Sequence, residues 1–146
     1  MAEVKYESKV VSNASSIGAI YQACSNLQNL EKLKETIPHN DRISELEFQP
    51  DFIRFKVDGL GQKIGIRIIA KEENDYVKFG IENAPVDGNF WIQLKAAGPQ
   101  ETKLRLTVKV DLPTMFKMMV GGKIQSALDQ AADMFAKIPF EQLNRE

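Results

Sequence analysis

Between residues 42 and 111 the sequence alternates apolar and polar residues in six short runs, and this alternation constrains the fold more than any other feature. A period of two residues is typical of strands that bury one face. Turn-forming residues separate the runs, among them Asp58-Gly59 and Gly98-Pro99. Because the connections are short and one face is polar, we predict an antiparallel meander.

The two faces of this predicted sheet differ in chemistry. The apolar face carries Leu46, Phe48, Ile53, Phe55, Val57, Ile64, Ile66, Ile68, Val77, Phe79, Ile81, Phe90, Ile92, Leu94, Leu104, Leu106, Val108 and Val110. The other face carries a stripe of basic residues, namely Lys63, Arg67, Lys95, Lys103, Arg105 and Lys109. The chain has 19 basic and 20 acidic residues, so we interpret the stripe as a solvated face and predict no nucleic-acid partner.

One strand is predicted at the N-terminus, and helical signals follow it. Residues 4–11 alternate as a strand, with Tyr6 and Ser8 on its inner side. Two short helices are then predicted to end before Pro38. Their candidate caps are Ser12, Asn13 and Ser15 for the first, and a capping box of Ser25 and Gln28 for the second.

After the meander the period changes to that of an amphipathic helix. The pattern predicts a helix over residues 113–138, which would be roughly 39 Å long and able to cross the whole sheet. Pro113 suits its first turn and Pro139 ends it. The pair Gly121-Gly122 is a predicted kink or weak point in its interior.

Composition excludes several classes of function. A chain of 146 residues without low-complexity stretches predicts a single domain over residues 1–146. No window is apolar enough for a membrane span and the first residues lack a signal-peptide layout, so we expect a cytoplasmic protein. With Cys24 and His39 as the single cysteine and histidine, cysteine-based zinc and histidine-rich metal sites are excluded within one chain, and we predict no metal and no cofactor.

The order of strand, two short helices, six-stranded meander and long helix resembles the helix-grip fold of the SRPBCC superfamily, which includes START domains, birch-pollen-allergen-like proteins and polyketide cyclases. Local features of the resemblance are Tyr6-Glu7-Ser8-Lys9, Ser25-Asn26-Leu27 and Asp111-Leu112-Pro113. The resemblance implies an α+β fold in which a curved seven-stranded antiparallel sheet wraps around the C-terminal helix. It also implies a cavity between sheet and helix that holds a largely apolar molecule.

The predicted ligand site lies on the inner face of the sheet and on the helix that faces it. Its residues are Tyr6, Ser8, Phe55, Ile66, Phe79, Ile92, Leu106, Met119, Ala127 and Ala131. Small side chains in the middle of the helix would leave room for a guest. In the alternative interpretation, the alanines let helix and sheet approach closely and fill the space.

The leading functional hypothesis is therefore binding or transport of a small hydrophobic ligand, lipid-like or polyketide-like, without a catalytic residue. One alternative is a polyketide-cyclase-like enzyme in which the hydroxyl of Tyr6 or Ser8 orients a carbonyl. The other is a protein-interaction module or homodimer that uses Trp91, predicted on the polar side of its strand, or the methionines Met115, Met118 and Met119. We predict that Cys24 is a buried filler and that His39 is solvated in a turn.

Overall fold

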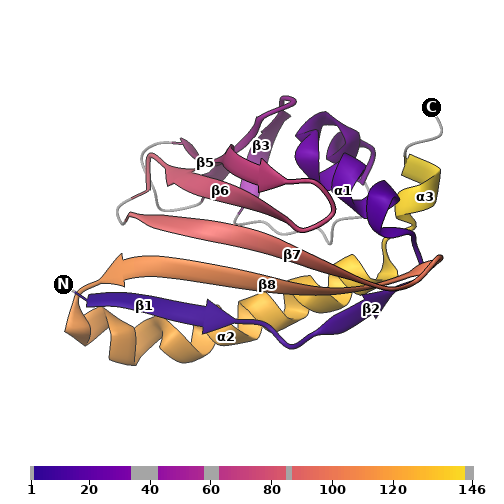
Figure 1. Cartoon of the computed structure of the whole chain (residues 1–146). Helices are drawn as coiled ribbons and strands as arrows, with labels where there is room; N and C mark the ends of the chain where they lie inside the picture. Colours follow the sequence, from indigo (N-terminus) through magenta and orange to yellow (C-terminus); the bar gives the residue numbers. More distant parts are fainter. Residues whose placement is uncertain (1, 34–42, 58–62, 85–86, 144–146) are drawn as a thin grey trace.

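The computed structural model describes residues 2–33, 43–57, 63–84 and 87–143 (Figure 1). In these ranges eight strands form one antiparallel sheet. The strands are β1 (Ala2–Glu7), β2 (Val11–Asn13), β3 (Ile43–Phe48), β4 (Phe52–Val57), β5 (Lys63–Glu72), β6 (Tyr76–Glu82), β7 (Gly88–Gly98) and β8 (Glu101–Leu112). The helices are α1 (Ile17–Ser25), the 3-10 helix η1 (Leu27–Leu33), α2 (Thr114–Lys137) and α3 (Phe140–Leu143).

The sheet follows the meander that the alternation predicts. Its order is β1-β8-β7-β6-β5-β4-β3, and β2 also pairs with β8. The chain thus places its first strand beside its last one, and only β1 and β3 lie at the ends of this path. The predicted α+β architecture, with a curved antiparallel sheet and a long C-terminal helix, is confirmed.

The first strand is interrupted, although the sequence predicts it as continuous over residues 4–11. β1 ends at Glu7 and β2 begins at Val11. At the break, Ser8 exchanges two hydrogen bonds with Leu106: its backbone N–H donates to the carbonyl of Leu106 at 2.8 Å, and its hydroxyl accepts from the Leu106 N–H at 2.9 Å. A side chain replaces part of the backbone ladder here, and Val10 points outward with 59% of its surface exposed.

The two short helices form where the sequence predicts them, but with other caps. Ser16, rather than Ser12, Asn13 or Ser15, caps α1, since its hydroxyl accepts from the backbone N–H of Ala19. The predicted capping box of Ser25 and Gln28 is also wrong. The side chain of Asn26 accepts from the Gln28 N–H at 3.2 Å, and the segment that follows is a 3-10 helix.

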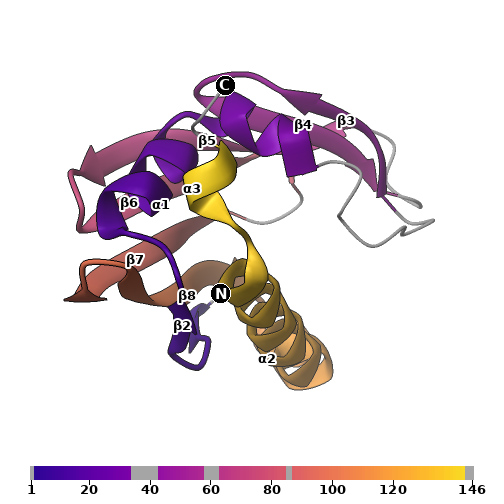
Figure 2. The ribbon, with the colours of Figure 1, turned by 90° about the vertical axis from the view of Figure 1, so that its right-hand side faces the viewer.

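The long helix agrees with its prediction at both ends and continues through Gly121-Gly122. α2 runs along β8 and β1, whereas α1 packs against β6 and β7 (Figures 1 and 2). The hydrophobic core lies between these helices and the sheet. Its largest fully buried apolar side chains are Phe79, Phe140, Ile20, Leu27, Leu104, Leu106 and Val77.

Candidate functional site

The register of the strands arranges the inner apolar face in continuous rows. One row, read from β1 to β5, consists of Tyr6, Val108, Phe90, Phe79 and Ile68. The rings of Phe79 and Phe90 lie 5.6 Å apart between centroids, in a tilted arrangement that aromatic pairs favour. An apolar surface therefore extends without interruption from the edge of the sheet at β1 to β5.

Part of this surface is used by the core. Phe79, Ile92 and Leu106 are buried in the same cluster as Ile20 of α1 and Phe140 of α3. These three predicted site residues therefore support the fold, and any ligand would meet them only at the margin of the core.

The rest of the inner face is only partly covered. We call the following residues the open inner face because each is half-buried and the register places it on the inner side: Ile53, Phe55, Ile64, Ile66, Ile68, Ile81, Phe90 and Val108. Phe55 and Ile66 belong to the predicted site. In Figure 2, β3, β4 and β5 arch away from α2, which packs mainly against β1, β2 and β8. Within this face, Ile53, Ile66, Ile68, Phe90 and Val108 also pack against the buried core cluster.

Hydrogen bonds join the middle and C-terminal part of α2 to residues at the end of β1. The backbone N–H of Lys9 donates to Asp129 at 2.9 Å, and the Lys9 ammonium donates to Asp133 at 2.9 Å. This hydrogen bond to Asp133 is the main reason that the pKa of Lys9 is raised. The amide of Gln125 donates to the carbonyl of Glu7 at 2.8 Å.

Asn13 closes the C-terminal end of α2. Its side-chain amide donates to the carbonyls of Phe135 at 2.7 Å, Ala136 at 3.2 Å and Ile138 at 2.9 Å. The last carbonyls of a helix have no partner within its regular hydrogen-bond pattern, so a buried donor stabilises this end. Asn13 adds a second donor to the carbonyls of Phe135 and Ile138, which also accept from the backbone N–H groups of Ile138 and Phe140. The sequence predicts Asn13 as a cap for the start of α1, whereas its side chain serves the end of α2.

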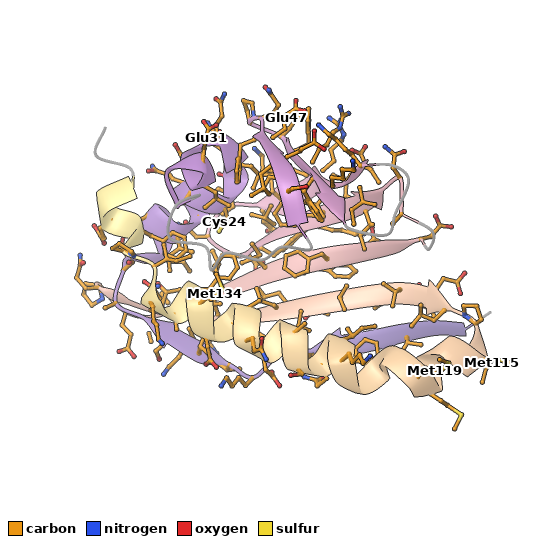
Figure 3. All side chains as sticks on the ribbon, turned by 180° about the vertical axis from the view of Figure 1, so that it is seen from behind. Cys24, Glu31, Glu47, Met115, Met119 and Met134 are labelled. Atoms are coloured by element: carbon orange, nitrogen blue, oxygen red, sulfur yellow. The ribbon has the colours of Figure 1, made fainter. Side chains whose placement is uncertain are left out.

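The N-terminal half of α2 lacks comparable attachments. Across residues 114–124, none of the described side chains donates or accepts a hydrogen bond to the sheet. Met115, Met118 and Met119 project into solvent, and Figure 3 shows Met115 and Met119 on the outside of this end of the helix. The prediction that Met119 lines the interior is corrected, since 65% of its surface is exposed.

The helix face that meets the sheet is offset from the predicted one. Ala127 is exposed, whereas Leu128 and Ala132 are buried and Ala131 is half-buried. Successive residues of a helix are 100° apart around its axis, so a difference of one position moves a side chain from the edge of the buried helix face to solvent. Ala132 is thus the alanine that allows close packing, and Ala127 is corrected to a surface position.

The two predicted inner hydroxyls have different surroundings. Ser8 is buried, accepts from Leu106 and donates to the carbonyl of Lys9 at 2.8 Å, so its hydroxyl is engaged by the backbone. The hydroxyl of Tyr6 is buried and has no hydrogen-bond partner in the described part of the chain. It lies close to Gly121 of α2.

Other reactive groups contribute nothing to this surface. Burial raises the pKa of the Cys24 thiol to about 12, so Cys24 is a core residue that stays protonated at neutral pH, as predicted. His39 lies outside the described residues. Within the described ranges, no group of three histidine, cysteine, aspartate or glutamate side chains is arranged to hold a metal ion. None of the helices described is long and apolar enough to cross a membrane.

Three of the six basic side chains of the predicted stripe, Arg67, Lys103 and Arg105, pair with acids. Arg67 bonds Glu82 at 2.9 Å and Asp51 at 3.0 Å, and Arg105 bonds Glu7 at 3.0 Å. The sequence pattern gave no signal for one feature of this face: the ring of Phe52 lies within 4.6 Å of two guanidinium carbons, those of Arg54 and Arg67.

Comparisons with known proteins agree with this geometry. Norcoclaurine synthase from Thalictrum flavum is similar over 99% of this chain and 96% of its own, with a TM-score of 0.71 and 12% identity. The Zhui aromatase/cyclase from Streptomyces matches 99% of this chain and 95% of its own, with a TM-score of 0.60 and 14% identity. A START-superfamily protein from Mycobacterium smegmatis covers 91% of this chain and 98% of its own, with a TM-score of 0.54 and 18% identity.

The chain has the helix-grip fold that it shares with these solved structures. No protein-family profile and no curated protein matches its sequence. At these identities the similarity establishes the fold alone, because the helix-grip fold carries different activities on different side chains. The function of this helix-grip protein must therefore be argued from its own open inner face.

Proposed function

We propose that the protein binds a small, mostly apolar molecule on the open inner face, between the sheet and α2, and acts as a carrier or sensor. The observation that carries the proposal is a set of half-buried isoleucine and phenylalanine side chains on the concave side of the sheet. Apolar surface on a concave face gains about 25 cal/mol for each Å² that a ligand removes from water. A ligand that covers several of these side chains would gain enough free energy to stay bound.

The chemistry of the site supports binding rather than catalysis. The open inner face consists of hydrocarbon side chains, and the nearby hydroxyl of Ser8 is engaged by the backbone. General acid or base catalysis requires a titratable group within hydrogen-bond distance of the reacting atom. The cyclase alternative therefore rests on Tyr6, whose enclosed hydroxyl would have to become accessible, and it predicts that Tyr6→Phe abolishes turnover.

The first experiment is native mass spectrometry of the purified protein, followed by organic extraction and identification of any released molecule. We expect an added mass that disappears on denaturation and belongs to a lipid-like or polyketide-like compound. The same spectrum reports whether the protein is a monomer or a homodimer.

A second experiment locates the ligand. The purified protein is titrated with a dansylated fatty acid, and Ile68→Glu is compared with Ile69→Glu. Ile68 belongs to the open inner face, whereas its neighbour Ile69 is 53% exposed, beside Gly80 on the outer side. We expect Ile68→Glu to weaken probe binding at least about tenfold, equivalent to 1.4 kcal/mol, and Ile69→Glu to leave it unchanged. Equal binding by both folded variants would refute the proposed location.

A further inference from the structure

Trp91 lies in the middle of the outer face, at the centre of an unusual group of side chains. It pairs with Lys78 on β6 and with Thr107 on β8, and its neighbours in sequence point to the inner side. The ammonium of Lys78 lies 5.1 Å from the centroid of the indole ring, and that of Lys109 lies 5.8 Å away. Both distances are within the range in which a cation is attracted to an aromatic ring.

The two lysines differ from the ion-paired basic residues on this face. Arg67, Arg105 and Lys103 each have an acidic partner within 4 Å. In the described ranges, Lys78 and Lys109 form no ion pair, and each instead makes a cation–π contact with the indole ring. Positive charge is thus concentrated over Trp91.

A hollow of about 350 Å³ adjoins the indole ring. Its walls are Ala70, Asp75, Tyr76, Lys78, Trp91 and Gln93. Gln93 is held in place because its side-chain amide oxygen, Oε1, accepts from Arg105 at 3.0 Å and from Thr107 at 2.9 Å. The volume is at the lower end of the range for ligand pockets, which suits one large side chain rather than a whole extended ligand.

We propose that this surface, the Trp91 patch (Lys109 and the residues that line the hollow), docks an acidic segment of a partner protein. An apolar side chain of the segment fills the hollow between the two aromatic rings, and neighbouring carboxylates pair with Lys78 and Lys109. Asp75 would repel an acidic group inside the hollow, so the acidic groups belong over the lysines. Trp is among the residues that contribute most to binding at protein interfaces.

The combination of two cations and a hollow favours a chain segment over a single anion. Lys78 and Lys109 come from the strands on either side of β7, and both ammonium groups lie over the same indole ring. A lone carboxylate or phosphate would meet the two cations and leave the hollow beside them empty. A segment that carries an apolar side chain next to acidic ones contacts both.

The test uses Trp91 as its own reporter, because it is the single tryptophan of the chain. The purified protein is titrated at low salt with a short synthetic peptide in which one Phe is flanked on each side by Asp and Glu. We expect a saturable change in Trp91 emission that weakens with added salt, since exposed charges are screened. Replacing Lys78 and Lys109 together by Gln should weaken binding about tenfold or more, whereas Asp75→Asn should strengthen it.

The matched control is Lys95→Gln, an exposed lysine of β7 outside the hollow, which should bind the peptide as the unmodified protein does. A peptide with Ser in place of Phe should bind at least about tenfold more weakly. The proposal fails if the acidic peptide leaves the emission unchanged at millimolar concentration, or if the double lysine variant binds it normally. It also fails if vesicles of phosphatidylserine and phosphatidylcholine shift the emission and the peptide does not, because the patch would then face a membrane.

Discussion

The hydroxyl of Tyr6 occupies the space that a side chain at position 121 would need. A Cβ atom at Gly121 would lie 2.9 Å from the Tyr6 oxygen, closer than two such atoms approach in proteins. The same hydroxyl is buried without a hydrogen-bond partner among the described residues, which costs about 1–3 kcal/mol. Glycine at 121 is therefore explained by the close approach of β1 and α2.

The first prediction compares the two glycines of α2. Glycine is less favourable than alanine inside a helix by about 1 kcal/mol. At Gly122 nothing lies within 4 Å of a new Cβ, so Gly122→Ala should raise the free energy of unfolding by roughly that amount. Gly121→Ala meets Tyr6 and should be at least about 1 kcal/mol less stable than Gly122→Ala in urea unfolding.

A second change isolates the cause of this difference. Tyr6→Phe removes the oxygen and leaves ring atoms at 3.8 Å, an ordinary contact distance. In the Tyr6→Phe background, Gly121→Ala should therefore stabilise the protein about as much as Gly122→Ala does. If the deficit of Gly121→Ala persists there, the contact with Tyr6 is not its cause.

The second prediction concerns the end of α2. Asn13→Ala removes three hydrogen bonds to backbone carbonyls and should lower the free energy of unfolding by about 2 kcal/mol. The control is Asn29→Ala, which removes one bond of 3.4 Å to the carbonyl of Gln22 and should cost less than about 0.5 kcal/mol. Chemical denaturation of the two variants measures both values, and equal costs would contradict the role of Asn13.

The third prediction separates structure from chemistry at Ser8. Because its hydroxyl bonds Leu106 and Lys9, Ser8→Ala should lower the free energy of unfolding by about 1–2 kcal/mol. Uptake of the dansylated fatty acid should be unchanged under conditions where the variant is folded. A variant of normal stability that no longer takes up the probe would instead assign Ser8 to the ligand site.

The fourth prediction is a pH dependence from Cys24. Burial raises its pKa to about 12 in the folded protein, whereas the thiol of the unfolded chain ionises near pH 9. Between these values the folded state binds more protons, so stability falls as the pH rises through this window, by up to about 1.4 kcal/mol per pH unit. Below pH 9 the contribution is fully present.

Cys24→Ala should remove this slope while lowering stability at every pH, because it leaves a small cavity in the core. The measurement is urea unfolding of both proteins between pH 8.5 and pH 10.5, a range chosen to begin below the thiol pKa of the unfolded chain. Other groups that titrate there, including Tyr21, whose pKa is also raised by burial, are present in both proteins and cancel in the difference. Parallel curves would show that Cys24 does not ionise on unfolding.

Side-chain periodicity was sufficient to predict most of the fold. The alternation in residues 42–111 requires strands that bury one face, and the change of period after Leu112 requires a helix. Because connections between antiparallel neighbours are short, the order of the runs also predicted the order of the strands. Trp91 lies on the outer face for the same reason, since its position in the alternation determines its side.

Local polar details could not be obtained in this way. Asn13, Ser15 and Ser16 are all residues that cap helices, and the choice among them depends on which carbonyls α2 brings near, a contact over more than 120 residues. Likewise Ser8 interrupts the first strand because Leu106 is its neighbour in space. The sequence contains these residues but not the distances between them.

The sequence by itself determined the helix-grip architecture, because each segment must bury the apolar residues that recur at strand or helix spacing. This requirement is local and is repeated along the chain. The tertiary structure decided which apolar residues remain open and which are core. Ile92 and Ile66 occupy equivalent positions in the alternation, yet Ile92 is fully buried in the core that α1 covers, whereas Ile66 is only half-buried. This difference in burial arises because the helices cover only part of the sheet. The part that they leave uncovered is the candidate site.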